Sequence, residues 1–309
     1  MKVIFMGTPG FAVPSLKAIA KSRHEIMLVV TGEDKPAGRG RSLRESPVKT
    51  LARELNLPIL QPPTLKSAEF IEQLTQYNAD IIVVVAFRIL PGEVIDITPN
   101  GAINLHASLL PKYRGAAPIN WALINGDTQT GATVFQIRTR VDTGDILTRE
   151  KVDISEQDTF GILYDKLSWL GAKILVQTLD KLETGELQPI PQSHDLATKA
   201  PKIYPELGAI DWTKDARAIK WLIHGLSPAP GAYTFYKKKR IKILTAEYSM
   251  NSLSDIPGEI VTRNKKQFGI QTGKGVLYPL ELQAEGRKAL AVADFLKGFQ
   301  TEIGEKFSS

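Results

Sequence analysis

Residues 104–118 carry the side chains in this chain that are best suited to chemistry. They read Asn-Leu-His-Ala-Ser-Leu-Leu-Pro-Lys-Tyr-Arg-Gly-Ala-Ala-Pro and follow an apolar Gly-Ala-Ile, as expected where a strand ends in a loop. Because side chains alternate between the two faces of a strand, Asn104 and His106 should point the same way. An amide donor beside a titratable imidazole suits a reaction in which a carbonyl oxygen gains negative charge and a proton is moved.

A carboxylate is the third candidate group. The sequence Val-Asp-Thr-Gly-Asp at 141–145 follows a second apolar segment, 131–137. An aspartate before Thr-Gly is commonly a turn former, and a histidine near an asparagine is more often a structural pair than a catalytic one. Carboxylates at strand ends in α/β proteins, however, lie where ligands bind. We therefore expect Asp142 to orient His106 or to hold it protonated.

Length and composition exclude several kinds of protein and site. The 309 residues predict two domains, and 43% hydrophobic residues is ordinary for a globular protein. The chain has no cysteine and its four histidines lack metal-ligand spacing, so we expect no thiolate nucleophile and no bound metal. No apolar run reaches the ~18–20 residues of a membrane span, and because residues 1–7 lead directly into a strand without a cleavage region we expect no signal peptide. A cytoplasmic protein with no membrane partner is predicted.

The net charge of +6 is unevenly distributed along the chain. Residues 208–309 hold 16 basic and 10 acidic side chains, whereas residues 1–207 hold 23 of each. The densest basic run, Tyr-Lys-Lys-Lys-Arg at 236–240, is interleaved with Tyr233 and Phe235. A solvated hairpin tip is the commoner meaning of such a run. Basic and aromatic side chains together nevertheless indicate a polyanionic or oligonucleotide partner for this part of the chain.

The elements that must position these groups indicate an α/β domain. Strands near 2–7 and 25–31 with a helix near 12–21 between them favour a parallel, Rossmann-like sheet. The most apolar strand, 79–86, belongs at its centre. The first turn, Gly-Thr-Pro-Gly-Phe, has neither Gly-x-Gly-x-x-Gly nor Gly-Lys-Ser/Thr spacing. This spacing argues against NAD and nucleoside triphosphates as ligands.

Two long segments without clear periodicity divide the chain. Residues 32–49 contain three Gly, two Pro and five basic residues. Connections of this length are functional or disordered more often than structural, and a solvated loop is the alternative. From residue 208 onwards, short alternating segments separated by turns predict a small β-barrel or sandwich, and the basic and aromatic residues favour an oligonucleotide-binding barrel. We therefore expect a catalytic domain at 1–186, a Pro-containing linker at 187–207 and an OB-like barrel at 208–309.

Motifs spread over nearly the whole chain resemble those of the methionyl-tRNA formyltransferase family. They lie at 5–9, 11–14, 35–40, 46–49, 103–118, 141–145, 210–212, 230–232, 281–283 and 286–288. The Asn-x-His, Ser-Leu-Leu-Pro and Asp-Thr-Gly motifs are similar to those of folate-dependent formyltransferases in general. The Pro-Ala-Gly-Arg-Gly loop, Arg-Gly-Ala-Ala-Pro and the C-terminal barrel resemble the tRNA enzymes in particular.

The resemblance implies transfer of a formyl group from 10-formyltetrahydrofolate to the α-amino group of methionyl initiator tRNA, without a metal or a covalent enzyme intermediate. Asn104 and a cationic His106, supported by Asp142, would stabilise the oxyanion. The residues implied in folate binding are Ser108, Leu109, Leu110, Pro111, Phe87, Leu90 and Val141. Those implied in tRNA binding are Arg39, Arg41, Lys237, Lys238, Lys239 and Arg240. We expect a monomer.

Two departures from the family pattern accompany the resemblance. Gly10 stands where an acidic residue is usual, and Ala-Phe-Arg-Ile-Leu-Pro at 86–91 is one residue shorter than the usual Ala-Tyr-Gly-x-Ile-Leu-Pro. Four other functions remain to be weighed. A sugar-nucleotide formyltransferase would not need the Arg-rich loop, and a glycinamide ribonucleotide formyltransferase is essentially single-domain. A hydrolase releasing formate would use the same catalytic groups, whereas a catalytically silent RNA-binding protein would not need them.

Overall fold

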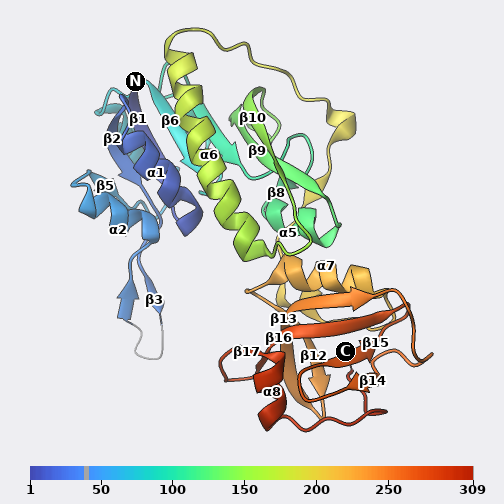
Figure 1. Ribbon diagram of the computed structural model, residues 1–309. Coiled ribbons are helices and arrows are strands. Elements are labelled where there is room, and N and C mark those ends of the chain that lie inside the picture. The colour runs from blue at the N-terminus through green and yellow to red at the C-terminus, as the bar shows by residue number, and fades with distance from the viewer. Residues whose placement is uncertain (38–41, 309) are drawn as a thin grey trace. The chain divides into compact units, whose positions relative to one another are not determined.

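The computed structural model describes residues 1–37 and 42–308 (Figure 1). The chain divides into two compact units. The first unit comprises Met1–Gly115, Thr130–Asp153 and Tyr164–Ala200, and the second comprises Ala116–Gln129, Ile154–Leu163 and Pro201–Ser309. None of the helices in the described parts of the chain is long and apolar enough to cross a lipid bilayer.

The first unit is built on a seven-stranded sheet with the order β10-β9-β7-β6-β1-β2-β5. Five of its strands are parallel: β1 (Lys2–Gly7), β2 (Glu25–Val30), β5 (Ile59–Leu60), β6 (Ile81–Val85) and β7 (Ala102–His106). Strand β9 (Gln129–Gln136) runs antiparallel to β7, and β10 (Ile146–Asp153) forms the edge. Strand β6 is buried along its whole length, as expected for a central strand of a parallel sheet. The predicted Rossmann-like sheet is confirmed.

Helices cover this sheet and complete its core. They are η1 (Gly10–Ala12), α1 (Val13–Ala20), α2 (Pro47–Glu54), α3 (Ala68–Thr75), α4 (Gly92–Ile95) and α6 (Phe160–Glu183). The Ser46 and Ser67 side chains accept hydrogen bonds from the first turns of α2 and α3, which satisfies backbone donors there. Helix α6 passes so close to β7 that a Cβ on Gly171 would lie 2.5 Å from the Leu105 side chain. A bulkier residue at 171 would therefore force the Leu105 side chain or the helix to shift.

Small elements complete the first unit. Strands β3 (Lys35–Ala37) and β4 (Ser42–Arg44) pair as an antiparallel hairpin within the long connection 32–49. Strand β8 (Arg114–Gly115) pairs in parallel with β11 (Lys199–Ala200), and η2 (His194–Leu196) precedes β11. Residues 187–200 of the expected linker belong to this unit, while 201–207 belong to the other.

The second unit contains an antiparallel sheet with the order β12-β13-β16-β15-β14. Its elements are α5 (Pro118–Ile124), η3 (Pro205–Gly208), α7 (Ala216–Leu226), β12 (Ala232–Tyr236), β13 (Lys239–Ser249), β14 (Ile260–Arg263), β15 (Phe268–Gln271), β16 (Val276–Ala284), β17 (Leu290–Ala291) and α8 (Val292–Gly298). The last described residues pair with both sheet edges, Ser308 with Phe235 and Lys306 with Glu259. This closes a barrel around an aromatic and aliphatic core. The predicted β-rich C-terminal domain is confirmed.

Candidate active site

Asn104 and His106 lie on the strand β7, as the alternation of the sequence predicts. Asn104 is opposite Phe135, and His106 is opposite Thr133, on the neighbouring strand β9. The Asn104 side chain is half-buried, and its amide has no hydrogen-bond partner among the described residues. An amide without a protein partner is available to donate a hydrogen bond to a bound molecule.

His106 is 6% exposed, and each of its ring nitrogens faces an oxygen atom. Nε2 lies 2.8 Å from the carbonyl oxygen of Tyr113, and Nδ1 lies 3.8 Å from Oδ2 of Asp142. Because a carbonyl oxygen can only accept, Nε2 must carry a hydrogen and donate it. The ring also meets Phe135 edge-on, with 6.4 Å between the ring centroids. The imidazole is thus oriented on three sides.

Asp142 reaches His106 by a route that the sequence did not indicate. Strand β9 is antiparallel to β7 and ends opposite Ile103. The carboxyl ends of parallel strands meet at one edge of a sheet, but this rule does not explain why Asp142 lies near His106. The chain instead folds back after β9, with Asp142 at a φ of 53°. Its Oδ2 accepts a hydrogen bond of 2.8 Å from the Gly115 N–H. The fold-back needs glycine at 144, because a Cβ there would lie 1.7 Å from the Gln136 carbonyl oxygen.

The turn after His106 is held together by its own side chains. The Ser108 hydroxyl donates to the carbonyl oxygen of Lys112 at 2.6 Å. Thr133 donates to the Ser108 carbonyl and accepts from the Leu110 N–H, at 2.6 and 3.2 Å. Leu110 is fully buried, whereas Leu109 and Pro111 are half-buried. Ser108 and Leu110 therefore brace the turn, and their neighbours remain partly open to a ligand.

The shortened segment 86–91 is attached to the rest of the first unit by a residue that sequence reasoning missed. The Arg88 guanidinium donates to the carbonyl oxygens of Pro62 and Pro63, at 2.8 and 3.1 Å, and lies 5.1 Å from the centroid of the Phe87 ring. Leu90 is buried in the core. The only signal of this role in the sequence is the arginine directly after Phe87, in a segment that is one residue shorter than the family pattern. Val141, in the loop after β9, is 51% exposed.

The basic run at 236–240 forms the turn between β12 and β13. Lys237 is paired with Glu305 at 2.6 Å, and the Tyr236 hydroxyl donates to the same carboxylate. Hydrogen bonds from Lys237 and Tyr236 lower the pKa of Glu305 to about 2. Tyr236 is only 3% exposed and packs in the barrel core. Tyr236 is therefore buried, whereas Lys237 is exposed but ion-paired with Glu305.

The other predicted tRNA-binding residues differ in how the structure places them. Lys238 and Lys239 are exposed. The Arg240 guanidinium lies 5.4 Å from the centroid of the Tyr233 ring. Arg39 and Arg41 lie outside the described residues.

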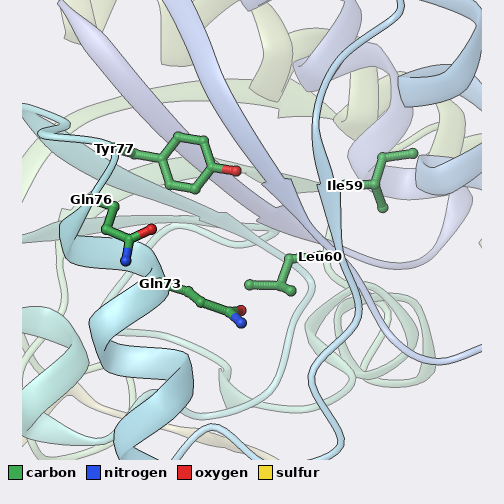
Figure 2. A pocket seen from close by; sticks show the side chains of 5 residues that line it. All are labelled: Ile59, Leu60, Gln73, Gln76 and Tyr77. Atoms are coloured by element: carbon green, nitrogen blue, oxygen red, sulfur yellow. The ribbon is translucent and has the colours of Figure 1, made fainter.

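A pocket of about 280 Å³ lies elsewhere in the first unit, on β5 and the end of α3 (Figure 2). It is lined by Ile59, Leu60, Gln73, Gln76 and Tyr77, none of which is a predicted site residue. Across the described residues, no cluster of three or more His, Cys, Asp or Glu side chains is arranged to hold a metal ion. The groups around His106 therefore remain the candidate active site.

Comparison with known proteins matches both units to one family. Residues 1–179 match the formyl transferase family and residues 202–300 match the formyl transferase C-terminal domain. The methionyl-tRNA formyltransferase of Agathobacter rectalis is 45% identical over 309 residues, covering 100% of both chains.

Two solved structures share the fold. WlaRD, a sugar 3N-formyl transferase crystallised in the presence of dTDP and 5-N-formyl-THF, has a TM-score of 0.69 at 19% identity, covering 93% of this chain and 99% of that one. HypX from Aquifex aeolicus in complex with tetrahydrofolic acid has a TM-score of 0.66 at 19% identity, covering 100% of this chain and 50% of that one.

Proposed function

The chain belongs to the methionyl-tRNA formyltransferase family, and from that premise we propose that it transfers the formyl group of 10-formyltetrahydrofolate to the α-amino group of methionyl initiator tRNA. It is a folate-dependent, formyl-transferring enzyme. The observation that carries the proposed chemistry is the amide of Asn104, which has no partner among the described residues, beside the His106–Asp142 pair. These groups match the needs of a formyl transfer, in which a carbonyl oxygen becomes an oxyanion.

The proposed reaction is a direct attack of the neutral amine on the formyl carbon. The new C–N bond forms as the carbonyl oxygen becomes an oxyanion, and the bond from the formyl carbon to N10 then breaks. The amine loses a proton and N10 gains one, which leaves tetrahydrofolate. Asn104 Nδ2 donates to the oxyanion, and a single donor of this kind is worth roughly 10²–10³ in rate.

His106 supplies the second hydrogen bond to the oxyanion, and to do so its Nε2–H has to leave the acceptor that it has in the structure. In the structure its Nε2–H is bonded to the neutral carbonyl of Tyr113. A developing oxyanion is a stronger acceptor than a neutral carbonyl, so the hydrogen bond moves to the substrate as charge builds up. The Asp142 carboxylate, 3.8 Å from Nδ1, orients the ring and compensates the charge of an imidazolium. Asp142 also helps to remove the amine proton through an ordered water.

The two substrates are proposed to bind different parts of the chain. Folate lies against the 108–111 turn, between the segment with Phe87 and Leu90 and the loop with Val141. Arg39 and Arg41 contact the acceptor stem, while Lys238, Lys239 and Arg240 bind its phosphates, with Lys237 joining them only if it leaves Glu305. In this proposal residues 1–186 catalyse and residues 208–309 bind tRNA. Of the expected linker 187–207, residues 187–200 belong to the catalytic unit and only 201–207 lie beyond it. The enzyme acts as a cytoplasmic monomer without a metal.

A transfer assay with three acceptors tests the proposal. Purified protein is mixed with 10-formyltetrahydrofolate and methionyl initiator tRNA, methionyl elongator tRNA or an amino-sugar nucleotide. Formylation confined to the initiator is the expected result. Transfer only to the sugar would keep the chemistry and overturn the acceptor, while release of formate without any acceptor would indicate a hydrolase.

A further inference from the structure

Residues 190–200, which we call the strap, lie against both loops that carry the candidate catalytic groups. At its start, Ile190 pairs with Ile146 through two backbone hydrogen bonds of 2.8 Å. This contact fixes the strap beside the first residue of β10, directly after the loop that contains Asp142. The segment is therefore part of the first unit's structure and is tied to the site.

Gln192 makes the central contact of the strap. Its side chain is buried, with the residue 7% exposed. Nε2 donates to the backbone carbonyl oxygens of Asp142 and Gly144, at 3.1 and 2.7 Å. Oε1 accepts from Nε and Nη2 of Arg114, at 3.1 and 2.6 Å. Two donors and two acceptor positions are all that an amide side chain has, so Gln192 is fully satisfied by the two loops.

The far end of the strap holds the other loop. The Tyr113 N–H donates to the Thr198 hydroxyl at 2.8 Å, and the Arg114 N–H donates to the Thr198 carbonyl at 2.9 Å. Gly115 has a φ of 125°, and a Cβ there would lie 2.5 Å from the Ala200 carbonyl oxygen, so the two backbones need glycine to meet. The strap thus holds Tyr113, which accepts from His106, and Gly115, which donates to Asp142.

The backbone around Asp142 is held from outside its own loop. Asp142 lies after the end of β9, and its φ of 53° is in the left-handed region, which is uncommon for non-glycine residues although aspartate adopts it more often than most. The two bonds from Gln192 hold the backbone on both sides of Thr143. We propose that Gln192 is a positioning residue that fixes the Asp142 carboxylate against His106 in the formyl transfer. This inference rests on the proposed function.

Substitutions of Gln192 separate positioning from other roles. Gln192→Glu keeps the shape and an acceptor for Arg114 but sets a carboxylate oxygen against two carbonyl oxygens, which repels them. Gln192→Met keeps the approximate volume and removes all four hydrogen bonds. Gln188→Glu is the matched control, because Gln188 lies just before the strap and is exposed. All variants are compared by formyl transfer at saturating substrates, tRNA binding and thermal unfolding.

The expected result is a fall in kcat of about 10- to 100-fold for both Gln192 variants, the size of effect that a misplacement of about 1 Å produces. The Kd for tRNA should stay within about twofold, and Gln188→Glu should match the wild type. If both Gln192 variants transfer formyl at the wild-type rate while Asp142→Asn is impaired, the positioning role is overturned and the proposed function stands. A wild-type protein without formyl transfer would instead overturn the proposed function.

A double-mutant cycle decides whether Gln192 acts through Asp142. If it does, adding Gln192→Glu or Gln192→Met to Asp142→Asn should lower kcat by less than about threefold more, because the carboxylate to be positioned is already gone. A merely structural role predicts the full additional loss in the double variant, together with a lower unfolding temperature. That additive result would overturn the inference, whichever Gln192 variant produced it.

Discussion

The Nε2 atom of His106 lies 2.8 Å from the carbonyl oxygen of Tyr113, so its hydrogen is already donated within the protein. The amide of Asn104, two residues earlier on β7, has no such partner among the described residues. The two donors proposed for the oxyanion therefore start from different states. Asn104 is ready to bind the formyl oxygen, whereas His106 has to leave Tyr113 first.

Replacing Asn104 tests the free donor. Asn104→Asp keeps the size but puts acceptor oxygens where a donor is needed, so kcat should fall by roughly 10²–10³. Steady-state kinetics with both substrates provide the measurement. The same substitution at the exposed Asn251, in the second unit, should have no effect. A kcat for Asn104→Asp within twofold of the wild type would remove this amide from the mechanism.

Replacing Asp142 tests the support of His106. Asp142→Asn removes the charge that compensates the imidazolium and should lower turnover by orders of magnitude, while the affinity for tRNA changes little. Single-turnover transfer and a separate tRNA-binding measurement distinguish the two effects. Unchanged turnover would contradict the assigned role, and loss of both properties would point to a damaged fold.

Arg88 should matter for the donor substrate and not for tRNA. Arg88→Ala removes the bonds to Pro62 and Pro63 and releases the segment beside Phe87, so KM for 10-formyltetrahydrofolate should rise about tenfold. The Kd for tRNA should not change. Arg23→Ala is a suitable control, because Arg23 is an ion-paired arginine of the same unit. An unaltered folate KM would show that the segment holds its shape without the guanidinium.

The salt dependence of tRNA binding tests the basic turn. Replacing Lys238 and Lys239 together by alanine should make tRNA binding less sensitive to salt. A plot of the log of the association constant against the log of the salt concentration should become less steep by about two, if each lysine contacts one phosphate. The double variant Lys265→Ala, Lys266→Ala is the matched control, because it removes the same charge from another exposed turn of the barrel. Equal slopes for the two double variants would place the phosphates on another surface.

Glu305 should contribute to stability in a pH-dependent way. Its folded-state pKa is lowered from 4.5 to about 2, so its contribution is fully present above pH 4.5 and is lost as the pH falls towards 2. Glu305→Gln should therefore unfold at a lower temperature than the wild type at pH 7, and the two should converge near pH 2. Thermal unfolding followed by circular dichroism at several pH values measures this. A difference that stays constant from pH 7 to pH 2 would contradict the assignment.

Local patterns in the sequence were enough to predict the fold class and to name Asn104, His106 and Asp142 as the groups of the candidate site. The β-α-β opening predicted the parallel sheet, and alternating segments after residue 208 predicted the β-rich domain. The two-residue period of a strand placed Asn104 and His106 on one face. These features depend on neighbours within a few residues, and such neighbours are visible in the sequence.

Only the tertiary structure decided how distant segments meet. The approach of Asp142 to His106 depends on an antiparallel β9 and a loop that folds back, and the apolar run at 131–137 does not reveal its direction. The pairing of Lys237 with Glu305 and the contacts of Gln192 likewise join segments that are far apart in the chain. Hydrogen bonds and ion pairs of this kind depend on three-dimensional distance, and residue types and spacing do not specify them.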